Sequence, residues 1–69
     1  MLHRVTTWHD DDGNVRQVEV CVLAHDWEPL WKRFTTLGPF DDPSVERSAL
    51  LEEGRAWYNL HGEQQHLGW

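Results

Sequence analysis

The stretch of residues 26–39 limits what this chain can fold into more than any other. Its large apolar residues recur at the three- and four-residue spacing of one helix face, and they are Trp27, Leu30, Trp31, Phe34 and Leu37. Asp26 can cap the first turn, and Pro29 lies where a missing N–H costs nothing. Gly38-Pro39 is a typical helix stop. The pattern predicts a helix over about residues 27–37 whose aromatic face builds the core.

The first third of the chain alternates apolar and polar residues on both sides of a turn signal. Asp12-Gly13 favours a tight reversal, because glycine adopts the positive φ that a Cβ disfavours. Closing there predicts an antiparallel hairpin over residues 2–24. The pairs expected from that closure are Thr7 with Val18, Val5 with Val20 and His3 with Val22. Closing one residue later, at Gly13-Asn14, would shift the register by two and keep the same inner face. A two-stranded sheet alone is marginal in water, so we expect a helix over its valine-rich inner face.

A second helix start follows at Asp42-Pro43, because an N-cap aspartate often precedes a proline at the first helical position. The apolar spacing continues to about His61, where Gly62 can end the helix. Gly54 costs about 1 kcal/mol relative to alanine, which indicates close approach to the first helix. The short connection between the two helices predicts an antiparallel pair. The expected fold is α+β with the order ββαα, an N-terminal antiparallel β-hairpin packed against an antiparallel helical hairpin.

The 69 residues make one small domain, in which residues 62–69 are a tail without periodicity. Twelve acidic against six basic residues give a formal net charge of −6, which repels nucleic-acid phosphates and anionic membranes. No apolar run is long enough to span a bilayer, and no signal peptide follows Met1. The single cysteine, Cys21, agrees with a reducing compartment. We therefore expect a cytoplasmic protein that binds neither nucleic acid nor membrane.

The composition also bears on the origin of the chain. It has no isoleucine, and it has one lysine against five arginines, a bias that GC-rich codons produce. A short acidic chain of this kind fits a bacterial protein, or a product of a phage or mobile element. In the second case its location would be the host cytoplasm.

Three features of the sequence suggest a metal site or a catalytic residue, but none has the arrangement of residues that such a site needs. Residues 10–14 look like a calcium loop, but aligning Gly13 with the invariant glycine of an EF-hand places an apolar residue at the first ligand position. His61 and His66 are five residues apart, so on a helix they diverge by about 140°. Cys21 lies between two valines, with no neighbouring base to activate it. The sequence predicts no catalytic, metal or cofactor site and no enzyme activity.

Two tryptophans, Trp8 and Trp69, do not lie on a predicted buried face. Exposed tryptophan is enriched at the anchors of protein interfaces. The alternative is that Trp8 folds over the edge of the sheet and Trp69 packs on the body of the protein, since the core is so small. Trp8 belongs to the outer face of the hairpin, which mixes apolar, polar and charged residues. The predicted protein-contact surface comprises Arg4, Thr6, Trp8, Glu19, Leu23 and Trp69.

The sequence therefore favours a non-enzymatic protein-binding module, of the kind that a phage or mobile element makes to bind and modulate a host protein. Its partner is another protein or a second copy of the chain, joined through a hairpin edge or an outer sheet face. The alternative is an acidic nucleic-acid mimic that blocks a DNA-binding protein. The acids that would stand in for phosphates are residues 10–12, Asp41, Asp42, Glu46, Glu52 and Glu53.

Overall fold

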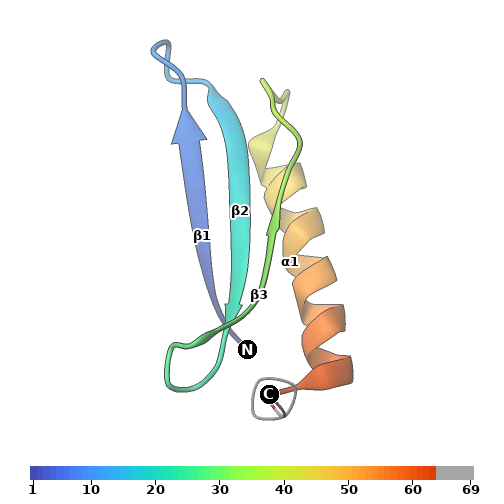
Figure 1. Ribbon diagram of the computed structural model, residues 1–69. Helices are drawn as coiled ribbons and strands as arrows, with labels where there is room; N and C mark the ends of the chain where they lie inside the picture. Colours follow the sequence, from blue (N-terminus) through green and yellow to red (C-terminus); the bar gives the residue numbers. More distant parts are fainter. Residues whose placement is uncertain (64–69) are drawn as a thin grey trace.

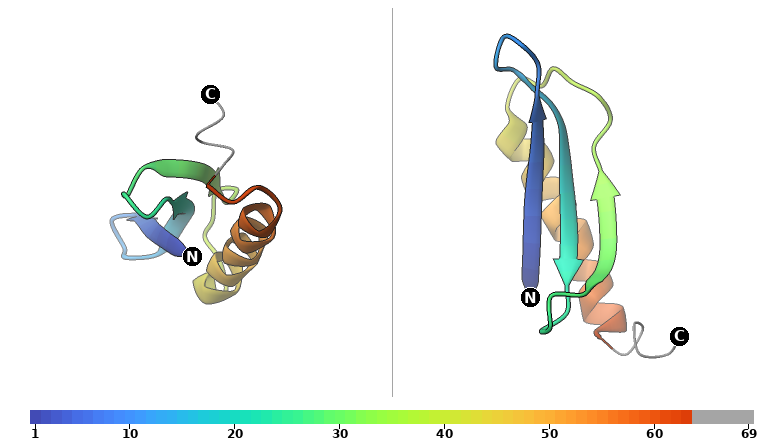
Figure 2. Two further views of the ribbon diagram at one scale, coloured as in Figure 1. Left: turned by 90° about the horizontal axis from the view of Figure 1, so that it is seen from below. Right: turned by 60° about the vertical axis from the view of Figure 1, so that its left-hand side comes forward.

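The computed structural model describes residues 1–63, which form one three-stranded sheet and one helix (Figure 1). The elements are β1 (Leu2–His9), β2 (Val15–Leu23), β3 (Pro29–Phe34) and α1 (Pro43–His61). The antiparallel sheet has the order β1-β2-β3, so β2 is the central strand. α1 runs along one face of the sheet, as both views of Figure 2 show. The α+β class is confirmed, whereas the ββαα order with a helical hairpin is wrong.

The β1–β2 hairpin has the register that the alternation predicts. The pairs Thr7–Val18, Val5–Val20 and His3–Val22 all occur. The reversal itself is a loop over residues 10–14 rather than a two-residue turn. Asp10 Oδ1 accepts hydrogen bonds from the backbone N–H groups of Asp12 and Asn14, each at 2.9 Å. The register then shifts between Trp8 and His9, and this irregularity compensates for the longer loop.

The helix predicted over residues 27–37 is wrong, because residues 29–34 form strand β3. β3 pairs antiparallel with β2 and sets Trp31 opposite Val22. Two features of the sequence explain this outcome. Pro29 disfavours the helical conformation in the residue before it, which breaks the first turn of the expected helix. β2 has apolar residues on both faces, and its backbone groups need a strand on each side.

The same correction moves aromatic residues out of the core. Trp27 lies in the loop between β2 and β3, where it is 67% exposed and has a φ of +70°. Phe34, at the end of β3, is 46% exposed. Trp31 is half-buried because its ring faces α1. Of the three aromatic residues that the helix pattern assigned to the core, Trp31 alone packs there.

α1 begins and ends where the sequence predicts. Asp42 is the N-cap and accepts a hydrogen bond from a first-turn N–H at 3.1 Å, and Gly62 follows the last turn with a φ of +56°. Gly54 lies against the sheet rather than against a second helix. A Cβ there would come within 2.9 Å of both the Trp31 ring and a Val22 methyl group. The missing side chain therefore lets α1 approach the sheet.

The core is centred on β2. Its buried apolar residues are Val18, Val20, Cys21, Val22, Leu23 and Ala24, joined by Leu50 of α1. α1 covers the valine-rich inner face of β2, as the sequence predicts. The opposite face of β2 is buried as well, because β1 and β3 flank it on both sides and their long side chains lie over it.

Candidate functional site

The outer face of the sheet is the face that points away from α1. Val22 and Trp31 face α1, so the positions next to them along each strand belong to the outer face. The register places on it Leu2, Arg4, Thr6 and Trp8 of β1, Glu19, Cys21 and Leu23 of β2, and Lys32 and Phe34 of β3. No helix or further strand among residues 1–63 covers this face (Figure 2).

Two aromatic rings meet on the outer face. Trp8 of β1 and Phe34 of β3 have ring centroids 6.0 Å apart and ring planes tilted by 36°. This separation is typical of favourable aromatic pairs. The two strands lie on opposite sides of β2, so the rings meet across the central strand. Trp8 is 43% exposed and Phe34 is 46% exposed, which leaves much of both rings accessible to a partner.

Two basic residues lie on the same face as the aromatic pair, further along the strands. Arg4 and Lys32 are opposite Cys21, one on each side of β2, and both are exposed. They are two of the six basic residues in a chain of net charge −6, so the outer face is more basic than the rest of the surface. Burial raises the pKa of the Cys21 thiol, which keeps it protonated and unreactive at neutral pH.

The structure separates the predicted contact residues into three groups. Arg4 and Trp8 are exposed on the outer face, and Thr6 is half-buried there. Glu19 and Leu23 belong to the same face, but they are only 7% and 3% exposed. The reason is that β3 supplies a second flanking strand, so these positions offer little surface to a partner. Trp69 lies outside the described residues.

Sequence reasoning missed two surface aromatic residues, Phe34 and Trp27, because it assigned both to a helix core. Trp27 lies in the β2–β3 loop, at the other end of the sheet from the end of β3 (Figure 1). The sequence feature that could have identified both as surface residues is the unbroken apolar run of residues 20–24. Such a run is typical of a strand that is buried on both faces and flanked on both edges.

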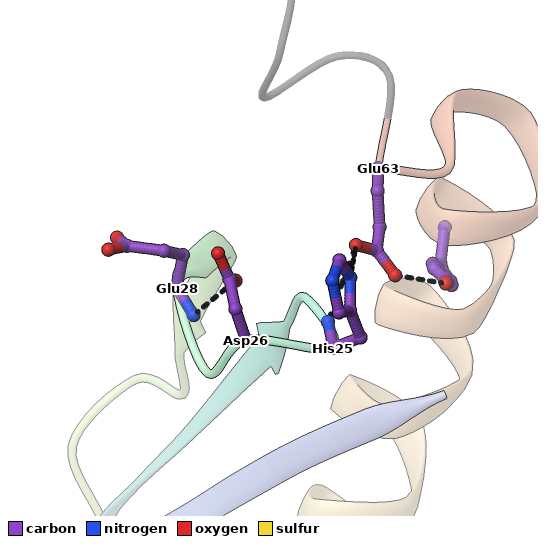
Figure 3. Close-up of polar contacts among 5 residues, drawn as sticks. His25, Asp26, Glu28 and Glu63 are labelled. Carbon is purple, nitrogen blue, oxygen red and sulfur yellow. Dashed lines mark hydrogen bonds and ion pairs between the residues drawn. The ribbon is translucent and has the colours of Figure 1, made fainter.

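A polar contact, the loop latch, joins the β2–β3 loop to the end of α1 (Figure 3). His25 Nδ1 lies 2.7 Å from Glu63 Oε1, and the His25 backbone N–H donates to the same oxygen at 3.3 Å. The Tyr58 hydroxyl donates to Glu63 Oε2 at 3.3 Å. Within the loop, the Glu28 N–H donates to Asp26 Oδ1 at 3.2 Å. The hydrogen bond between the two side chains raises the pKa of His25 and lowers the pKa of Glu63.

Two other acidic residues, Asp10 and Asp42, have shifted pKa values because they accept hydrogen bonds from residues that follow them closely in the chain. Hydrogen bonds from Asn14 lower the pKa of Asp10, and those from Ser44 lower the pKa of Asp42. Among residues 1–63, no three His, Cys, Asp or Glu side chains converge closely enough to hold a metal ion. The same part of the chain contains no helix of the length and apolarity needed to cross a membrane.

The chain was also compared with known proteins. No protein-family model matches it, and no curated protein and no solved structure is similar enough to count as a match.

Proposed function

We propose that this chain is a non-enzymatic protein-binding module whose contact surface is the outer face. The observation that carries the proposal is the Trp8–Phe34 pair, two rings 6.0 Å apart and nearly half exposed on a sheet face that no described element covers. Leaving large rings in water is costly for a small protein with little core. Tryptophan is also enriched at the energetic centre of protein interfaces.

The rest of the outer face suits the same role. Arg4 and Lys32 add long, positively charged side chains to the same face, and arginine is a frequent interface anchor like tryptophan. Paired strands hold the backbone at these positions in place, so little backbone conformational entropy is lost on binding. In this surface Phe34 and Lys32 take the places that the sequence assigned to Glu19 and Leu23, which are buried.

The partner that we expect is a host protein in the cytoplasm of a bacterium. The small size and the GC-rich bias of the composition fit a phage or mobile-element product. A complementary partner surface would be apolar where it meets the two rings and acidic opposite Arg4 and Lys32, since complementary charge guides association and fixes orientation.

The test is capture of a partner from a GC-rich bacterial lysate by the immobilised chain, compared across variants. Trp8→Ala and Phe34→Ala should each weaken retention of the captured protein by about tenfold or more, as truncation of an interface anchor does. Leu60→Ala is the matched control, because Leu60 is 82% exposed on α1, away from the outer face. Equal retention by wild type and both ring variants would refute this surface.

The second candidate function is the acidic nucleic-acid mimic that blocks a DNA-binding protein. It is favoured by the placement of the acids, since the loop of residues 10–14 and the start of α1 lie at the same end of the molecule (Figure 1). The lowered pKa values of Asp10 and Asp42 keep both carboxylates charged. Salt separates the two functions. Binding to a basic groove through many acids weakens steeply as salt rises, whereas an interface anchored by aromatic rings, with two basic residues on the same face, weakens much less.

A further inference from the structure

β1 lies at one edge of the sheet, and its backbone edge away from β2 is open. It runs for eight residues, contains neither proline nor glycine, and among the described residues it pairs with β2 alone. The backbone N–H and C=O groups along its other side therefore have no strand partner within residues 1–63. An edge of this length is a ready template for pairing with another strand.

β3, the other edge, carries protections that β1 lacks. It begins with Pro29 and carries Lys32 and Arg33 side by side, and proline and charge both disfavour edge-to-edge pairing. α1 also packs along β3, where Arg33 Nη1 donates to Glu53 Oε1 at 3.5 Å. β1 has one charged residue, Arg4, and its register shifts only near its last residue. The sequence therefore disfavours pairing of another strand with the edge of β3 but not with the edge of β1.

We infer that two copies of this chain pair antiparallel through their β1 edges and form one continuous six-stranded sheet. A twofold axis relates the copies, so the same strand meets itself. Residues that face each other across a strand pair point their side chains to the same side of the sheet. Registers that pair odd with odd and even with even positions therefore keep both valine-rich inner faces, and both α1 helices, on one side. This dimer does not depend on a partner at the outer face.

The side chains of β1 fit such a pairing when Thr6 lies on the axis. Thr6 then faces its own copy, and Val5 faces Thr7 of the other chain, which gives β-branched pairs. Arg4 faces Trp8 on each side of the axis, where a guanidinium against an indole is a favourable cation–π contact. Centring the pairing on Val5 would set Arg4 opposite Thr6 and lose that contact. The register on Thr6 is therefore the one that we assign.

The position of α1 leaves room for the second copy. α1 makes its main contacts with β2 and β3, on a face of the sheet, whereas the second copy would add in the plane of the sheet beside β1. Figure 2 shows that the helix lies against one face of the sheet, so it does not occupy the position beside β1 in the plane of the sheet. A chain of 69 residues also gains from self-association, because a core of this size supplies little net stability and the one cysteine cannot form an internal disulfide.

The oligomeric state of the full chain tests the inference, measured by sedimentation equilibrium over a range of concentrations. The wild-type chain should have twice the monomer mass at high concentration. Thr6→Lys should weaken the dimer about fivefold or more, because the new charge meets its own copy on the axis. Thr7→Lys is the matched control, since it adds the same charge to the neighbouring position but faces Val5. A monomeric wild type, or equal effects of the two lysines, would overturn the inference. The partner of the β1 edge would then have to be a strand of a different protein.

Cysteine cross-linking gives an independent readout of the same geometry. Thr6→Cys should form a disulfide between copies under mild oxidation, because directly opposite Cβ atoms lie about 5 Å apart. Thr7→Cys should cross-link much less, since its copy lies diagonally across the strand pair. Cys21 is buried and does not compete. A folded Thr6→Cys variant, verified by circular dichroism, that gives no cross-linked species would contradict the pairing.

Discussion

β1 and β3 flank the same central strand, but the molecule supports them to different degrees. β3 pairs with β2 and also packs under α1, where the Trp31 ring meets Gly54 and Arg33 reaches Glu53. β1 pairs with β2 and is otherwise open, and its least exposed residues, Val5 and Thr6, are only half-buried. α1 contacts β2 and β3 more than β1, so within residues 1–63 the support of β1 comes mainly from its pairing with β2.

Contacts outside the sheet reinforce this difference. The loop latch ties the loop that enters β3 to the end of α1 through His25 and Glu63. Beyond β3, the Thr35 N–H donates to the Val18 carbonyl at 2.9 Å, and the Gly38 N–H donates to the Arg16 carbonyl at 2.7 Å. The chain on both sides of β3 is therefore fixed to its surroundings. We expect substitutions on the β3 side to change stability more than comparable ones on β1.

The largest effect is expected at the contact between α1 and β3. Gly54→Ala adds a Cβ that meets the Trp31 ring and the buried Val22 at 2.9 Å, and neither is a flexible side-chain end that can move away. Overpacking should outweigh the gain in helix propensity and lower the free energy of unfolding by about 2 kcal/mol. Urea denaturation measures this loss.

Two controls decide whether this effect is specific to the β3 side. Alanine at the exposed helix position Asn59 should instead stabilise by about 0.5 kcal/mol, through helix propensity alone. Thr7→Ala on β1 should cost about 0.5 kcal/mol or less, measured at a concentration too low for self-association. A loss at Thr7 as large as the loss at Gly54 would remove the distinction between the two edges.

An intermediate effect of opposite sign is expected in the loop that enters β3. Trp27 has a φ of +70°, a conformation that glycine adopts without strain and that costs other residues about 1 kcal/mol. Because the ring is 67% exposed, little buried area is lost on its removal. Trp27→Gly should raise the free energy of unfolding by about 0.5–1 kcal/mol, whereas Trp27→Ala keeps the strain and should not. Destabilisation by the glycine would mean that the indole packs on the loop more than its exposure indicates.

The smallest effect is expected from the loop latch, because His25 is exposed and its charge is screened by water. The pKa of His25 is raised, so its contribution to stability is complete below the ordinary value of 6.5 and is lost as the pH rises through the raised value. The pKa of Glu63 is lowered, so its contribution is complete above 4.5 and is lost as the pH falls through the lowered value. The melting temperature should therefore gain from the latch mainly between pH 4.5 and 6.5.

The variant His25→Asn should remove that gain and flatten the profile of melting temperature against pH in this window. His3→Asn, at an exposed histidine of β1, is the control and should leave the profile as it is. High salt should reproduce part of the His25→Asn effect, since it screens an exposed ion pair. The reverse pattern, with His3 controlling the profile, would assign the pH dependence to the β1 side.

The parts of the fold that local signals specify could be predicted from the sequence. Alternation around Asp12-Gly13 predicted which residues share the inner face of the β1–β2 hairpin, and the register is the one expected from closure at Asp12-Gly13, although the loop is longer than a two-residue turn. Asp42-Pro43 and Gly62 fixed the ends of α1. In each case the residues that decide the structure lie close together in the chain, so no knowledge of the tertiary contacts was needed.

The strand β3 could not be predicted in the same way, because its apolar spacing also fits a helix and the choice depends on distant residues. β2 decides it by requiring a second neighbour for its backbone. The wrong prediction of a helix at β3 also affected the predicted contact surface. It left Phe34 out of the contact surface, and it kept Glu19 and Leu23 on that surface although a third strand buries them. The binding role of Arg4 and Trp8 stays a prediction.

The contact between Gly54 and Trp31 has a consequence for evolution. The space between α1 and the sheet at this point admits an indole on one side only if the other side contributes no Cβ. In diverged proteins that keep this architecture, a larger helix residue at position 54 must therefore accompany a smaller ring or an aliphatic residue at position 31. Covariation of these two positions would be a fingerprint for distant homologues whose overall identity has faded.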